Sequence, residues 1–343
     1  MLRLFVSVTS AILLAACGPG TASDSVSSAP AGADSLSILR LDPGLDSLIA
    51  PDARIEVLAE GFAWSEGPLW VPEEGGYLLF SDIPPNRVMR WSEAGGLSRY
   101  LFPAGSADST REGGEPGSNG LLLDEAGRLV LCQHGDRQVA RMAAPLSDPA
   151  PRFVSLASHF EGKRLNSPND AVFDRQGRLY FTDPPYGLPN GPGDPAQELS
   201  FQGVFRLDPD GQLYLLVDSL TRPNGIGLSP DERTLYVAVS DPERARIHAF
   251  QLNGVGEVDG GSLLVDLTAE GAKPGSKGLP DGLVVAPNGI LYATGPGGVW
   301  VLTPEGKALG QIRTGQATAN CTIGGDGYLY MTAHMYLMRV RLR

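Results

Sequence analysis

Cysteine is scarce in this chain of 343 residues. Only three cysteines occur, and one of them, Cys17, lies near the N-terminus. Secreted proteins held together by disulfides carry many more, so the remaining Cys132 and Cys321 do not provide a disulfide framework. We expect two free thiols packed in the interior, with a single disulfide as the alternative.

Basic residues are also outnumbered. The chain has 27 Lys and Arg against 39 Asp and Glu, a formal net charge of −12. Binding to nucleic acid, or to an anionic membrane by charge, requires the opposite sign, so neither is expected. An acidic balance is compatible with a cation site without establishing one. The expected partners are a small-molecule substrate and a membrane reached through a lipid anchor alone, and a monomer is the default oligomeric state.

Long apolar runs are absent apart from one at the start. Residues 4–16 form an apolar and small-residue run behind a short basic start, long enough for a signal-peptide core and too short to span a bilayer. The run ends in Leu14-Ala15-Ala16-Cys17, which resembles a bacterial lipobox. This pattern predicts lipidation of Cys17, and the alternative is a plain secretory signal with a chance cysteine.

These features predict three parts of the chain. They are a signal peptide over 1–16, a lipidated cysteine with a flexible linker over 17–50, and a folded domain over 51–343. The start of the linker is rich in Gly, Ala, Ser, Pro and Asp, a composition too poor in apolar residues to fold. We therefore expect an exported protein, lipid-anchored in the bacterial cell envelope at the outer membrane or facing the periplasm. A soluble secreted protein is the alternative.

No segment shows a helical period, and the chain repeats a strand pattern instead. One unit reads Pro-Asn-Asp-Ala-Val-Phe-Asp over 168–174, a Gly-containing turn, and Leu-Tyr-Phe-Thr over 179–182. Such units begin about 40 to 57 residues apart, near Glu66, Asn119, Asn169, Asn224, Asp281 and Asn320. This period, with about four strands per unit, is typical of a β-propeller. The fold class predicted is all-β, a six-bladed β-propeller.

The last repeat contains only three strands before the chain ends. Residues 54–60, ahead of the first repeat, also have the pattern of a strand. We predict that this N-terminal strand becomes the outer strand of the last blade and closes the ring, because closure removes an exposed strand edge.

The six residues that open the repeats have side-chain oxygen in common. Two are carboxylates, Glu66 and Asp281, and four are carboxamides, with no His or Cys among them. Because the first strand of each blade lines the central channel, these residues should form a ring at one mouth of it. Such oxygen ligands suit a hard cation such as Ca²⁺. The alternative is that Asn and Asp serve here as turn residues, which does not account for Glu66.

Five motifs in register resemble the gluconolactonase branch of the SMP-30/gluconolactonase/LRE-like family, over a region from about residue 55 to the C-terminus. The motifs are Ser65-Glu66-Gly67-Pro68-Leu69-Trp70, Leu165-Asn166-Ser167-Pro168-Asn169-Asp170, Thr182-Asp183-Pro184-Pro185-Tyr186-Gly187, Arg222-Pro223-Asn224-Gly225 and Leu279-Pro280-Asp281-Gly282.

The resemblance implies a metal-dependent hydrolase of sugar lactones or related cyclic esters. Its single divalent cation would be held by Glu66, Asn169, Asn224 and Asp281, with calcium expected and magnesium, manganese or zinc as alternatives. The cation would polarise the lactone carbonyl. Asp281 is the expected catalytic base toward water, because Glu66 is better placed as a fixed ligand.

Five further side chains are expected to contact substrate: Asn119, His134, Tyr186, Asn320 and His334. The two asparagines belong to the ring but fall outside the implied ligand set. The other three follow second strands of blades, which run back toward the mouth, although a histidine there can equally be structural. The long loops 103–118 and 184–202 have the length to cover the mouth.

Three alternative functions remain open from the sequence. Related propellers cleave phosphotriesters through a similar calcium site. A non-enzymatic lipoprotein could bind a sugar or another ligand in the same pocket. A structural propeller could use the ion only to hold the ring together, although a dense oxygen cluster at an open mouth disfavours that.

Overall fold

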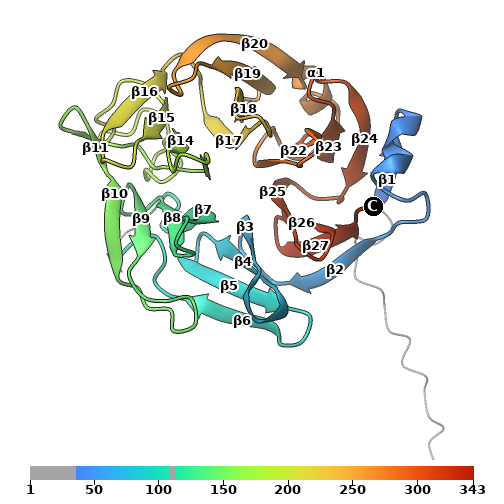
Figure 1. Cartoon of the computed structure of the whole chain (residues 1–343), viewed down its shortest axis with the longest axis horizontal. Coiled ribbons are helices and arrows are strands. Elements are labelled where there is room, and N and C mark those ends of the chain that lie inside the picture. The colour runs from blue at the N-terminus through green and yellow to red at the C-terminus, as the bar shows by residue number, and fades with distance from the viewer. Residues whose placement is uncertain (1–35, 109–112) are drawn as a thin grey trace, which may run out of the picture. The chain divides into compact units, whose positions relative to one another are not determined.

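The computed structural model describes residues 36–108 and 113–343. The predicted signal peptide, the lipidation site Cys17 and most of the predicted linker lie outside these residues. In the described part, six antiparallel sheets are arranged as blades around a common centre (Figure 1). The prediction of an all-β, six-bladed propeller is confirmed. None of the helices described has the length and apolar character needed to cross a bilayer.

Each blade runs from an inner strand at the centre to an outer strand at the periphery. Blade one consists of β3 (Ser65–Val71), β4 (Tyr77–Asp82), β5 (Arg87–Ser92) and β6 (Gly96–Leu101). Blade two consists of β7 (Ser118–Leu123), β8 (Leu129–Gln133), β9 (Gln138–Met142) and β10 (Phe153–Ala157). Blade three consists of β13 (Ala171–Phe173), β14 (Leu179–Asp183), β15 (Gly203–Leu207) and β16 (Leu213–Val217).

The remaining blades follow the same order. Blade four consists of β17 (Pro223–Leu228), β18 (Thr234–Val239), β19 (Arg246–Leu252) and β20 (Val258–Asp266). Blade five consists of β21 (Leu283–Val285), β22 (Leu291–Gly295), β23 (Gly298–Leu302), β24 (Ala308–Arg313) and the outermost strand β1 (Ser37–Arg40). Blade six consists of β25 (Thr318–Ile323), β26 (Tyr328–Ala333), β27 (Tyr336–Arg341) and the outer strand β2 (Ile55–Glu60). The short elements are η2 (Pro43–Ser47), η3 (Glu73–Gly75), α1 (Thr268–Gly271) and the hairpin of β11 (His159–Phe160) and β12 (Lys163–Arg164).

The turns between the first two strands of a blade explain the repeated Asp-x-x-Gly pattern. In blade three, Oδ1 of Asp174 accepts hydrogen bonds from the backbone N–H of Gln176 and of Arg178, each at 2.9 Å. Gly177 has φ +76°, a conformation that glycine adopts without steric cost. Asp124 forms the same turn in blade two. Each turn reverses the chain, so every inner strand starts at the same end of the molecule.

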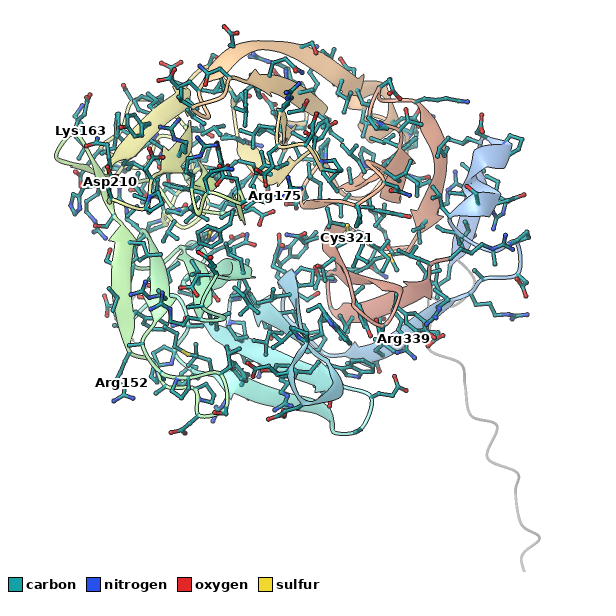
Figure 2. The ribbon with its side chains drawn as sticks, in the orientation of Figure 1. Arg152, Lys163, Arg175, Asp210, Cys321 and Arg339 are labelled. Carbon is teal, nitrogen blue, oxygen red and sulfur yellow. The ribbon has the colours of Figure 1, made fainter. Side chains whose placement is uncertain are left out.

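The hydrophobic core lies between neighbouring blades. One cluster joins Val130 and Cys132 of blade two to Phe181 and Phe205 of blade three, whose rings stack with centroids 5.3 Å apart. Cys321 is buried in another cluster, between blades five and six (Figure 2). Both cysteines are free, which confirms the prediction of two packed thiols.

The ring closes as predicted. Strand β2 pairs antiparallel with β27, with Ile55 opposite Val340, and forms the outer strand of blade six. Arg339 strengthens the seam by donating to Glu56 at 2.9 Å. An N-terminal strand therefore completes a blade built from the C-terminus.

The boundary predicted at residue 50 is wrong. Strand β1 pairs with the outer edge of blade five, with Ile38 opposite Ile312. Leu45 and Ile49 follow it and are fully buried against blades five and six. The region 36–50 contains enough leucine and isoleucine to cover this edge, so the packed domain begins before residue 51.

Candidate metal and active site

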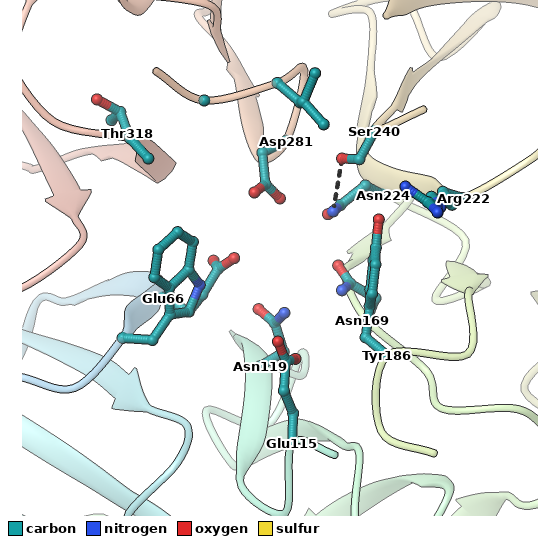
Figure 3. A pocket seen from close by; sticks show the side chains of 14 residues that line it. Glu66, Glu115, Asn119, Asn169, Tyr186, Arg222, Asn224, Ser240, Asp281 and Thr318 are labelled. Carbon is teal, nitrogen blue, oxygen red and sulfur yellow. Dashed lines mark hydrogen bonds between the residues drawn. The ribbon is translucent and has the colours of Figure 1, made fainter. Parts of the chain in front are cut away.

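A pocket of about 340 Å³ opens where the inner strands begin (Figure 3). Its volume lies within the range of small-molecule sites. The lining residues come from all six blades and from the loops between them. They are Trp64, Glu66, Glu115, Asn119, Asn169, Tyr186, Arg222, Asn224, Ser240, Gly278, Leu279, Asp281, Ala317 and Thr318.

Six of the nine side chains proposed from the sequence lie in this pocket. They are Glu66, Asn119, Asn169, Tyr186, Asn224 and Asp281. In Figure 3 the ring residues among them point toward one another from different blades. The four residues proposed as metal ligands are therefore together.

Two of the remaining three are held away from the pocket, which corrects the expected substrate contact. Asn320 is buried and lines a second cavity, between the inner strands, together with Asp170. Its Oδ1 accepts from the backbone N–H of the next residue, Cys321, at 2.7 Å. His134 is fully buried and lies behind Glu115, with Nδ1 2.9 Å from Oε2.

His334 also requires a correction. Its side chain is exposed and does not line the pocket. The ring packs edge-on against Trp64, with centroids 5.4 Å apart, and Trp64 itself lines the pocket. His334 has φ +54° at the tight connection between β26 and β27.

Backbone hydrogen bonds between blades hold the ring together. Gly120 N–H donates to the carbonyl of Asn169 at 2.8 Å, and Gly225 N–H donates to that of Asp281 at 3.2 Å. The contacts are close enough to require glycine. At Gly67, φ is +48° and an added Cβ would lie 2.1 Å from the carbonyl oxygen of Asn119. The Gly that follows Glu66, Asn119, Asn224 and Asp281 thus allows neighbouring blades to approach.

Hydroxyl side chains on second strands add a further set of links. Ser81 donates to the carbonyl of Asn119 at 2.8 Å, and Thr182 donates to that of Asn224 at 2.7 Å. Both hydroxyls are buried. Each one joins a blade to the ring residue of the next, so the backbone of the ring is fixed before any ligand binds.

Three oxygens in the pocket have no hydrogen-bond partner in the described part of the chain. They are the buried Oδ1 atoms of Asn119, Asn169 and Asp281. A buried acceptor without a partner is unfavourable unless a water or an ion satisfies it. The same residues 36–108 and 113–343 contain no cluster of three His, Cys, Asp or Glu that would hold a metal alone. A cation here would depend on carboxamides as well as carboxylates, and this donor set fits a hard cation.

Asn224 is oriented by a neighbour that the sequence did not single out as functional. Its Nδ2 donates to Ser240 Oγ at 3.0 Å, and Ser240 in turn donates to the carbonyl of Pro280 at 2.5 Å. The Asn224 side chain also hydrogen-bonds to the Asp281 carboxylate, so Ser240 and Asp281 together orient its amide group.

The two ring carboxylates have strongly perturbed acidities. Burial raises the pKa of Glu66 to about 8, and the charges of Asp170 and Glu115 act in the same direction, opposed by the Gly67 N–H at 3.0 Å. Burial also raises the pKa of Asp281 well above its usual range, with the charge of Glu66 adding to the effect. A bound divalent cation would reverse both effects, since opposite charge favours the ionised form.

Several lining residues were missed in the sequence, namely Trp64, Glu115, Arg222, Ser240 and Thr318. Arg222 lies inside the motif Arg-Pro-Asn-Gly, and its φ of +49° is unusual for a residue other than glycine. Glu115 lies in the loop that was expected to cover the mouth. The sequence therefore placed both residues in segments near the mouth. Nothing in the repeat pattern, however, distinguishes their side chains from solvent-exposed ones.

Comparison with known proteins places this geometry in a family. The family model described as "SMP-30/Gluconolactonase/LRE-like region" matches residues 64–335. A gluconolactonase from Zymomonas mobilis is 40% identical over 312 residues, covering 89% of this chain and 86% of the relative. A regucalcin from Xenopus laevis is 25% identical over 287 residues, covering 81% of this chain and 85% of the relative.

A solved structure agrees with the sequence comparison. The structure of a gluconolactonase from Xanthomonas campestris superimposes with a TM-score of 0.77 at 33% identity, covering 91% of this chain and 97% of that chain. The same region that carries the motifs and the pocket is thus shared with these relatives. The chain belongs to the SMP-30/gluconolactonase/LRE-like family.

Proposed function

We propose that this protein is a metal-dependent lactonase that hydrolyses sugar lactones or related cyclic esters. The observation that carries the proposal is the group of buried, unpaired oxygens of Asn119, Asn169 and Asp281 in a pocket of ligand size. Family membership supports the reaction class, because relatives at 40% and 33% identity are named gluconolactonases.

Glu66, Asn169, Asn224 and Asp281 would hold the cation. When bound, it supplies Lewis acidity toward the lactone carbonyl. Calcium is the expected ion, and magnesium or manganese would accept the same ligands, whereas zinc usually takes nitrogen or sulfur. Glu66 accepts from the Gly67 N–H at 3.0 Å and from the side chain of Asn320, which hold its carboxylate in the pocket.

Asp281 is proposed as the general base. Its unpaired Oδ1 faces the pocket and can take a proton from the attacking water. The water oxygen bonds to the carbonyl carbon, the ring C–O bond breaks, and the proton returns from Asp281 to the ring oxygen. The product is an open hydroxy acid. Asn119 and Tyr186 lie where they can orient the substrate by hydrogen bonds.

The test is hydrolysis of glucono-1,5-lactone and of simple γ- and δ-lactones, followed with a pH indicator. The protein used would comprise residues 35–343, which form one compact unit. Assays with calcium, with EDTA and with Asp281→Asn should show turnover only in the first. Absence of turnover on every lactone, with calcium binding verified by calorimetry, would overturn the proposal, and activity on phosphotriesters alone would replace it.

We also propose that the protein is exported and anchored through Cys17. The support is the lipobox-like sequence over 14–17, ahead of a domain that begins packing near residue 37. Metabolic labelling with a radioactive fatty acid should mark the wild-type protein and not Cys17→Ser. Equal labelling of both would contradict the anchor.

A further inference from the structure

Glu115 is an acidic side chain of the pocket that does not belong to the ring. It lies in the connection between β6 and β7, outside the repeat, and its side chain lines the pocket beside Asn119 (Figure 3). The side chain is 35% exposed, so its carboxylate is accessible from the mouth.

His134 lies directly behind this carboxylate. The ring is fully buried, and Nδ1 is 2.9 Å from Oε2 of Glu115, within ion-pair distance. Among residues 36–108 and 113–343, neither ring nitrogen makes a well-aligned hydrogen bond, and Glu115 is the acidic group that the imidazole faces. Glu115 is thus the polar group for which this buried imidazole is placed.

The surrounding backbone holds His134 and the two loops together. A Cβ added to Gly187 would lie 2.9 Å from Cβ of His134 and 2.6 Å from Cβ of Ser167. A Cβ added to Gly114, next to Glu115, would lie 2.7 Å from the carbonyl of Gly187. The loop that carries Glu115 therefore packs on the loop that carries Tyr186, and both lie against the backbone of His134.

The two partners of this ion pair differ in exposure. Here the histidine is enclosed and the carboxylate faces the pocket. Oε2 lies 2.9 Å from His134 Nδ1, and the carboxylate lines the pocket, where it can accept a hydrogen bond from a ligand. A carboxylate in this position can accept hydrogen bonds from the hydroxyl groups of a substrate. It forms no such bond with a lactone that lacks hydroxyl groups.

We propose that Glu115 selects lactones that carry hydroxyl groups, and that His134 positions it. This inference rests on the proposed lactonase function. Glu115 contacts substrate and determines specificity, while His134 acts only through Glu115.

The test compares two lactones with the same six-membered ring, D-glucono-1,5-lactone and δ-valerolactone, which lacks hydroxyls. Glu115→Gln should raise KM for gluconolactone about 10- to 100-fold, the value of a hydrogen bond to a charged group, with kcat almost unchanged. Its kcat/KM for δ-valerolactone should stay at the wild-type level. Glu74→Gln, which removes an exposed ion pair with Arg90, is the matched control and should alter neither substrate.

His134 is tested by a double-mutant cycle. His134→Ala should reproduce the selective rise in KM, and the double variant should be no worse than Glu115→Gln, because the histidine acts through the glutamate. His134→Gln, which retains a donor, should recover part of the loss and covers the case in which His134→Ala does not fold.

Two outcomes would overturn the inference alone. They are an equal loss on both lactones in Glu115→Gln, or an unchanged KM for gluconolactone, in a protein whose wild type hydrolyses lactones. Failure of the wild type on both lactones would instead overturn the proposed function, and this inference with it.

Discussion

At the turn end of the blades, Asp124 and Asp174 have their carboxylates occupied by local partners, whereas Asn119, Asn169 and Asp281 at the mouth each keep a buried oxygen without a partner in the described residues. At Asp174, two backbone N–H groups and Arg178 fill the oxygens. The same residue types therefore serve the backbone at one end and remain available to a ligand at the other.

This difference separates the two interpretations of Asx residues before a strand. Where such a residue makes a turn, its oxygen bonds to an N–H two residues further on, as in Asp174. At the mouth, other groups hold the backbone of the ring residues, so the Asn and Asp side chains there are not needed to form a turn. Ser81 and Thr182 provide those other groups at the mouth.

The largest expected effect comes from comparing one aspartate at the mouth with one at the turn end of the blades. Asp281→Asn should lower kcat by about 10² to 10⁴, the usual contribution of a general base. Asp174→Asn should leave kcat unchanged and cost about 1 kcal/mol of stability, because it weakens the pair with Arg178. Initial rates and thermal unfolding of both variants would check this, and a comparable loss of activity in Asp174→Asn would contradict the comparison.

A second test uses one glycine at each end. Gly67→Ala should destabilise the protein by about 3 kcal/mol, since the new Cβ would meet the Asn119 carbonyl at 2.1 Å in a left-handed conformation. Gly177→Ala has a similar φ, but its nearest neighbour is 3.7 Å away, so about 1 kcal/mol is expected. Midpoints of denaturant unfolding measure the loss of stability in both variants. Equal losses would show that the left-handed backbone conformation alone, and not the contact with Asn119, determines the cost.

A third test concerns the orientation of a ligand. Ser240→Ala removes the acceptor of Asn224 Nδ2 and should weaken calcium binding about 10- to 100-fold, as loss of a supporting hydrogen bond at metal sites does. Calorimetric titration of the protein with calcium is the measurement. Ser240→Thr retains the hydroxyl and should restore most of the affinity; unchanged affinity in Ser240→Ala would mean that Asn224 is held by other contacts.

The smallest effect is expected from the hydroxyls. Thr182→Val leaves the buried carbonyl of Asn224 without its side-chain donor and should cost about 1–3 kcal/mol of stability. Thr303→Val at a turn, where the hydroxyl accepts from Lys307 N–H at 3.3 Å, should cost less than about 1 kcal/mol. Thermal unfolding distinguishes them, and the reverse order would show that the mouth does not depend on these links.

The repeat by itself was sufficient for the fold class, the number of blades, the closing strand and the ring position of Glu66, Asn119, Asn169, Asn224 and Asp281. Strand periodicity and turn residues are local properties, so they can be recognised without knowing what each strand packs against. Once a propeller is assumed, one position in each repeat must converge on the channel.

Only the tertiary structure decided the features that depend on contacts between distant segments. Strand β1 joins blade five because its apolar residues cover that outer edge, and no repeat precedes it to reveal this. Asn320 occupies the repeat position of its ring counterparts, yet it lines the second cavity between the inner strands and not the pocket. Glu115 and His134 are 19 positions apart and meet only because two loops pack together. Local pattern determines where the strands begin, whereas packing between loops and blades determines which side chains reach the pocket.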